Sequence, residues 1–110
     1  MRNNRQKEHA GGSYMLSEIG NRLDGGELSS EEAKEASEEM SLSLAALRSA
    51  GEISNDAYLD AGVIQGGISV LSNMIDQGCN KEELLAHLNQ LRQRADRICL
   101  AHPGLAEYFD

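Results

Sequence analysis

Apolar residues recur along the chain at intervals of three and four, the spacing that places them on one face of an α-helix. Near the amino end a short stripe ends at Gly25-Gly26, and three longer stripes follow, in helices of about 20 to 24 residues. The short stripe is Leu16, Ile19 and Leu23. The longer ones are Ala33, Ala36, Met40, Leu44 and Leu47; Ala57, Ala61, Ile64, Ile68, Leu71 and Ile75; and Leu84, Leu88, Leu91, Ala95, Ile98 and His102.

Capping signals mark where the long helices begin. Ser29 with Glu32, and Asn80 with Glu83, have the spacing of a capping box, in which each side chain satisfies the other residue's backbone donor. Ser54 opens the helix between them. Helices of matching length joined by loops of about three residues favour antiparallel packing. The predicted fold is all-α: an antiparallel helical bundle of three long helices plus a short N-terminal helix.

The length and composition agree with one helical domain. A chain of 110 residues with one proline, no tryptophan and four aromatic residues is a poor candidate for a sheet protein. Residues 1–12 lack apolar periodicity and are net basic, so we expect them to be a disordered basic tail. Residues 13–110 are expected to form a single helical-bundle domain.

The net charge of -8 opposes direct binding to nucleic acid or anionic lipid. Most of this charge lies between residues 13 and 76, a segment that contains twelve acidic residues and three basic ones. The expected partner is therefore a protein with a basic surface.

The second predicted helix carries the densest group of acidic residues, on the side opposite its core stripe. Such a group can be an ordinary solvated face, a docking surface for a basic partner, or a mimic of nucleic acid. We take docking as the working hypothesis. Its predicted partner-binding residues are Glu31, Glu35, Glu38, Glu39 and the apolar Leu42.

Two of the four aromatic residues, Tyr108 and Phe109, lie at the carboxyl end, shortly after Leu105. They either fold back over an open end of the bundle or anchor a partner or a second copy. Tyr108 and Phe109 are therefore added to the predicted partner-binding residues.

Three glycines, Gly62, Gly66 and Gly67, interrupt the third predicted helix, and each costs roughly 1 kcal/mol relative to alanine. We expect close packing of a neighbouring helix at all three; a kink that shapes a groove, or a break at Gly66-Gly67, are the alternatives. A second apolar stripe makes this helix either central in the bundle or half of an oligomer interface. That stripe is Leu59, Val63, Val70 and Met74.

No catalytic or cofactor motif accompanies these features. Cys99 and His102 lie one turn apart, but His87 is more than three turns from Cys99, too far to share one tetrahedral ion. Cys79, before a helix cap, is interpreted as a small apolar filler. We expect no enzyme activity, no metal and no cofactor.

The sequence also predicts a cytoplasmic location. Two cysteines are too few for a disulfide scaffold, and a polar run rather than a signal peptide follows Met1. The longest charge-free run, residues 61–75, is too short to span a membrane.

These observations favour a non-enzymatic regulator or inhibitor that occupies a basic surface of a partner protein. Phage and mobile-element products that block host defence, including CRISPR inhibitors, share this small size and acidity. The alternative is a structural or chaperone-like helical subunit of an obligate oligomer, such as a homodimer.

Overall fold

The computed structural model describes residues 15–109, and this part of the chain contains helices and no strand. The elements are α1 (Met15–Asp24), α2 (Ser30–Ser49), α3 (Asn55–Asp76), α4 (Lys81–Ala101), the 3-10 turn η2 (Pro103–Leu105) and α5 (Ala106–Phe109). The predicted all-α bundle of three long helices and a short N-terminal helix is confirmed. The predicted basic tail of residues 1–12 lies outside the described residues.

The predicted helix starts are present as hydrogen bonds. Ser29 and Asn80 each accept a bond from the backbone of the third helical residue, and Glu32 and Glu83 complete the two capping boxes. Ser54 caps α3 in the same way, through the backbone N–H of Ala57. These bonds satisfy donors that a helix start would otherwise leave open, so they define where each long helix begins.

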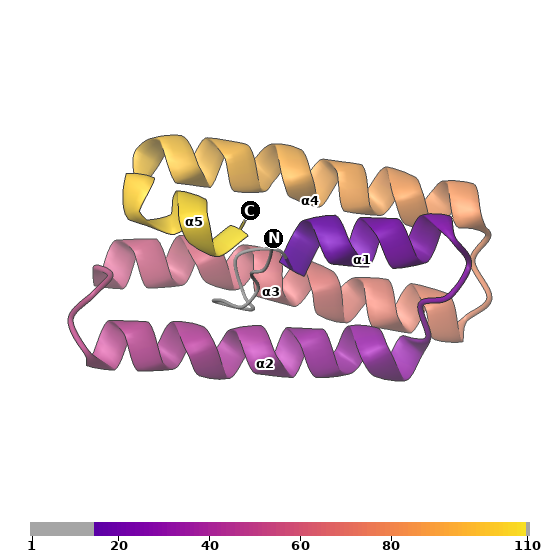
Figure 1. The fold of residues 1–110 in the computed structure, drawn as a ribbon, viewed down its shortest axis with the longest axis horizontal. Helices are drawn as coiled ribbons and strands as arrows, with labels where there is room; N and C mark the ends of the chain where they lie inside the picture. Colours follow the sequence, from indigo (N-terminus) through magenta and orange to yellow (C-terminus); the bar gives the residue numbers. More distant parts are fainter. Residues whose placement is uncertain (1–14, 110) are drawn as a thin grey trace, which may run out of the picture.

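The three long helices leave one side of the bundle to be closed by shorter pieces (Figure 1). α3 packs between α2 and α4, and α1 packs on α4. η2 and α5 fold back onto α4, and α5 contacts α1. In Figure 1, α1 and α5 therefore share one level of the bundle, each covering a different part of its length.

The core lies where these elements meet, and it contains most of the predicted stripes, but not Leu47 or His102. The largest fully buried side chains come from every long helix, from α1 and from η2: Leu16, Met40, Leu44, Ile64, Ile68, Leu71, Leu88 and Leu105. Leu105 and the capping pieces thus belong to the same apolar cluster as the long helices.

The C-terminal aromatic residues fold back onto the bundle, the first of the two alternatives expected for them: Phe109 is part of the core, and Tyr108 packs against it. Phe109 exposes 3% of its surface, and its ring meets the ring of Tyr108 edge-on at 5.3 Å. Tyr108 is half-buried, and its hydroxyl donates to the Met40 carbonyl oxygen at 3.3 Å. Burial of these rings removes apolar surface from water and so stabilises the fold.

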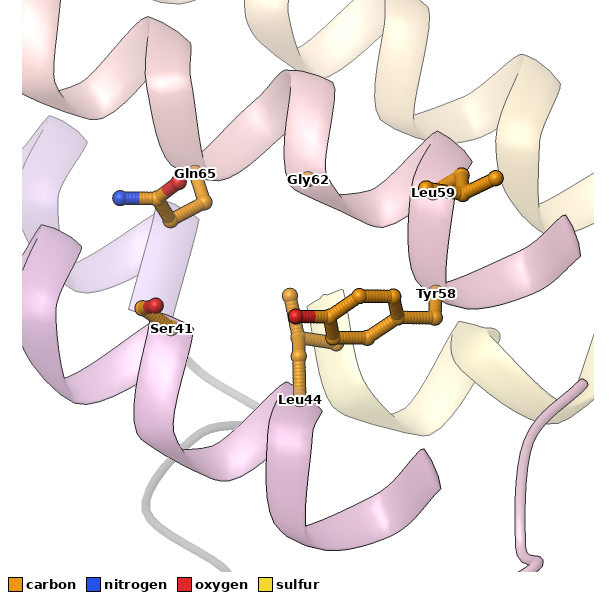
Figure 2. Close-up of a pocket in the computed structure, with 6 residues that line it drawn as sticks. All are labelled: Ser41, Leu44, Tyr58, Leu59, Gly62 and Gln65. Carbon is orange, nitrogen blue, oxygen red and sulfur yellow. The ribbon is translucent and has the colours of Figure 1, made fainter. Parts of the chain in front are cut away.

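The three helical glycines of α3 differ from one another. A Cβ at Gly67 would lie 2.1 Å from Leu91 Cδ2, so α4 approaches α3 closely there. A Cβ at Gly62 or Gly66 would meet nothing within 4 Å outside its own stretch of helix, so no other described helix packs closely against these two positions. Gly62 lines a hollow between α2 and α3 (Figure 2), and α3 continues unbroken past Gly66-Gly67.

Polar side chains that the apolar pattern does not reveal join α2 to α3. Ser37 is buried and donates to the Gln65 carbonyl oxygen at 3.2 Å, while the Gln65 amide donates to Ser37 Oγ at 2.7 Å. Ser72 donates to the Ser30 carbonyl oxygen at 2.8 Å. Small hydroxyl residues at this contact let the two helices approach while their polar atoms stay bonded.

Adjacent glycine substitutions test the close approach at Gly67. Gly67→Ala and Gly66→Ala gain the same helix propensity, but only the first meets Leu91. We expect the free energy of unfolding of Gly67→Ala to fall below that of Gly66→Ala by about 1–3 kcal/mol, measured by urea denaturation. Equal stabilities would contradict the packing described for α3 and α4.

The role of the C-terminal segment is tested by Phe109→Ala. Removing a buried phenylalanine ring should lower the free energy of unfolding by about 3–5 kcal/mol. Leu42→Ala, which truncates an exposed side chain, should change it by no more than about 0.5 kcal/mol. A neutral Phe109→Ala would mean that the ring does not cover the core.

Candidate binding site

A groove of about 250 Å³ separates α1 from α2. Carboxylates line its sides, and apolar side chains that belong to or pack against the core lie deeper. Its acidic residues are Glu18, Glu32, Glu35 and Glu39, its apolar residues are Ile19, Leu28 and Ala36, and Arg22 is its one lining cation among the described residues.

The groove exists because α1 packs against α4. Gly20 allows a close approach, since a Cβ there would already touch Leu88 Cδ2 and Arg92 Nη1, each at 3.4 Å. Three apolar residues of the short α1 then enter the core. The side of α1 that carries Glu18 and Arg22 is left facing α2 across the groove.

One ion pair crosses the groove, between Arg22 of α1 and Glu32 of α2. The backbone N–H of Ser29 also donates to Glu32 Oε1, at 3.0 Å. These bonds, the one from Ser29 first and the one from Arg22 second, lower the pKa of Glu32 below its ordinary value of 4.5. Glu32 therefore stays ionised, and Arg22 balances its negative charge within the molecule.

The remaining carboxylates of the groove are available to a ligand. Glu18, Glu35 and Glu39 are exposed and form no ion pair with any residue that the structure describes. Glu39 also acts on Tyr108: burial is the main cause of the raised pKa of the Tyr108 hydroxyl, and the negative charge of Glu39 adds to it.

The predicted binding residues of α2 divide into two groups. Glu35 and Glu39 line the groove. Glu31, Glu38 and Leu42 are exposed on α2 and do not line it. The groove and this outer edge together form the acidic face of the molecule.

The contribution of α1 to this face is not among the residues predicted from the sequence. Glu18 and Arg22 are one turn apart beside the core residue Ile19, and this spacing places them on the same side of a helix. That signal existed in the sequence. The pairing of Arg22 with Glu32 depends on how α1 crosses α2, which local spacing does not reveal.

The histidines and cysteines serve other contacts. His87 Nε2 lies 2.8 Å from the Gly67 carbonyl oxygen, and His102 Nε2 lies 2.8 Å from Asp60 Oδ2, so both link α4 to α3. Neither Cys79 nor Cys99 is in a disulfide. Across residues 15–109, no three His, Cys, Asp or Glu residues gather as metal ligands would.

Two further findings bear on the class of protein. Within the described residues, no helix has the length and apolar character needed to cross a membrane. Comparisons with protein-family models, curated proteins and solved structures find no match to this chain.

Because of the Arg22–Glu32 ion pair, we expect the stability of the fold to depend on pH. Because the folded-state pKa of Glu32 is lowered, its stabilising contribution is present at neutral pH and is lost as the pH falls below 4.5 through that pKa. Arg22→Gln should therefore raise the Glu32 pKa and lower stability at pH 7, with the two proteins converging in acid. NMR titration of the Glu32 side chain measures the pKa, and an unchanged value would contradict the ion pair.

Proposed function

We propose that this protein is a non-enzymatic regulator that binds a basic surface of a partner protein through its acidic face. The observation that carries the proposal is the groove between α1 and α2, where exposed carboxylates surround an apolar base. An ordinary solvated helix face would have charges without this recess. The combination suits a ligand that is apolar along its stem and cationic at its tip.

Arginine and lysine side chains have that form. In the proposed complex, the methylene stem of such a residue lies over Ile19 and Ala36, and its charged head reaches Glu35 or Glu39. Arg22 does not compete for these two carboxylates, because it is held by Glu32. Exposed Leu42, farther along α2, supplies an apolar contact at the edge of the interface.

The arrangement favours docking over imitation of nucleic acid. Residues 31–39 contain five carboxylates along roughly 13 Å of helix, and one of these, Glu32, is already paired. The remaining charges are spaced at about one per 3.4 Å, compared with about one per 1.7 Å in duplex DNA. The proposed role is therefore to occupy a basic surface and attract it electrostatically, without copying the spacing of phosphates.

Such a regulator inhibits its partner when the occupied surface is the one the partner uses. Basic surfaces commonly bind nucleic acid, so a nucleic-acid-binding effector is a suitable target. An inhibitor of host defence carried by a phage or mobile element, of the kind that blocks CRISPR effectors, would act in this way. The small size and the negative charge of the chain are what support a role as an inhibitor of host defence.

The proposal is tested by titrating isotope-labelled protein with an octa-arginine peptide. We expect NMR shifts to concentrate around the groove, at the backbone amides of Glu18, Ile19, Ala36 and Glu39. The affinity should fall steeply between 50 and 300 mM salt, because exposed charges are screened. The quadruple variant Glu31→Gln, Glu35→Gln, Glu38→Gln and Glu39→Gln should bind about tenfold more weakly or worse.

A matched control separates the effect of the acidic face from that of net charge. Replacing Glu52, Asp76, Glu82 and Asp96 by their amides changes the net charge equally at other exposed positions. This control should retain most of the affinity. Equal losses in the two quadruple variants, or shifts scattered over the whole surface, would refute a specific acidic site.

A further inference from the structure

Three exposed carboxylates of the groove between α1 and α2 have no cationic partner among the described residues. Arg22 is the only lining cation in that part of the chain, and it is paired with Glu32. Glu18, Glu35 and Glu39 form no ion pair with any residue from 15 to 109. Glu35 and Glu39 are four residues apart on α2 and repel one another, so a cation placed beside them is stabilising.

Basic residues are concentrated in the part of the sequence that leads into α1. Arg2, Arg5 and Lys7 are three of the ten lysine and arginine residues of the chain. They belong to the basic tail, residues 1–12, which contains one acidic residue, Glu8. The tail lies outside the described residues, and the sign of its charge is opposite to that of the groove.

The directions of α1 and α2 place Glu39 beside the start of α1. The two helices run in opposite directions along the groove and are joined by the turn after Asp24 (Figure 1). Met15 lies nine residues before the end of α1, and Glu39 lies nine residues after the start of α2. Each is therefore about 14 Å from the turn, so the groove extends to the point where the preceding sequence joins α1.

The basic residues are close enough in sequence to return to the groove. Lys7 precedes Met15 by eight residues and Arg5 precedes it by ten, and an extended chain advances at most about 3.6 Å per residue. Their reach is up to about 29 Å and about 36 Å, whereas the whole of α1 is about 15 Å long. Gly11 and Gly12 lie in between, and glycine permits the sharp change of direction that a return along α1 requires.

We propose that the basic tail occupies the acidic groove of its own chain and is displaced when a partner binds. This inference rests on the proposed function, since the tail and the partner offer the groove the same kind of side chain. The methylene stem of Arg5 or Lys7 lies over the apolar base of the groove, and the charged head reaches the carboxylates at its sides. The tail is thus an intramolecular competitor of the partner.

The covalent link between tail and groove determines which partners can compete. A segment joined to its site by a short linker acts at an effective concentration in the millimolar range. A single exposed ion pair is weak, so a partner that presents one cation does not displace the tail. A partner that presents several cations at once does displace it. The tail therefore makes the groove selective for densely basic surfaces.

Neutralising the tail in the full chain tests this contact without removing any residue. The double variant Arg5→Gln, Lys7→Gln, here the tail variant, removes two of the three cations of the tail. At 50 mM salt, its Ala36 and Glu39 backbone amides should shift relative to wild type in NMR spectra, and this difference should vanish at 500 mM salt. The difference should be the same at 20 and at 500 µM protein, because the contact lies within one chain.

A matched control, the double variant Arg94→Gln, Arg97→Gln, removes the same charge from exposed positions of α4. It should leave the Ala36 and Glu39 amides at their wild-type positions. Octa-arginine should bind the tail variant about twofold more tightly, or better, than the α4 variant, because only the tail variant has lost a tethered competitor. The two variants have the same net charge, so net charge does not account for such a difference.

Three results would each overturn the contact of the tail with its own groove. They are unchanged Ala36 and Glu39 amides in the tail variant, equal octa-arginine affinities of the two double variants, and shifts that depend on protein concentration. The proposed partner-binding role fails on a different result, namely no shifts at the groove when octa-arginine is added to the tail variant. That result would also overturn the tail as a regulator of partner binding.

Discussion

Burial of the core by three long helices and two short capping pieces is the constraint on which the rest of the structure depends. α2, α3 and α4 leave one side of their shared core open, and neither α1 nor the C-terminal segment is long enough to cover it. The two pieces meet there, and Leu16, Leu105 and Phe109 are buried as a result. Apolar burial is the largest favourable term in folding, so these residues serve the core before any other role.

The same arrangement accounts for two surfaces of contrasting character. Because α1 packs on α4, a recess remains between α1 and α2, and the acidic residues of both helices gather around it. Because the capping pieces lie on the side formed with α4, they do not cover the outward side of α3. The molecule therefore presents one acidic face and one uncharged, partly apolar face. The first is the face through which we propose that a basic partner binds.

Much of the fold follows from local sequence rules, whereas the sites depend on how the helices meet. The apolar stripes and the Ser29, Ser54 and Asn80 caps specify the helices, because they involve residues close in sequence. The burial of Phe109 and the pairing of Arg22 with Glu32 depend on how the helices cross, which spacing alone does not determine. The glycines of α3 also show that spacing alone does not determine packing. A Cβ added at Gly67 would clash with Leu91, whereas one added at the adjacent Gly66 would meet no other helix within 4 Å.

Phe109 offers the most direct measurement, because it is the only phenylalanine in the chain. In a sample with labelled phenylalanine, the ring protons should show nuclear Overhauser effects to core methyl groups of α1 and α4, the helices that α5 contacts. That result would establish that the two short pieces close the bundle together. Ring protons with contacts only to neighbouring residues, and with the shifts of a solvated side chain, would contradict it.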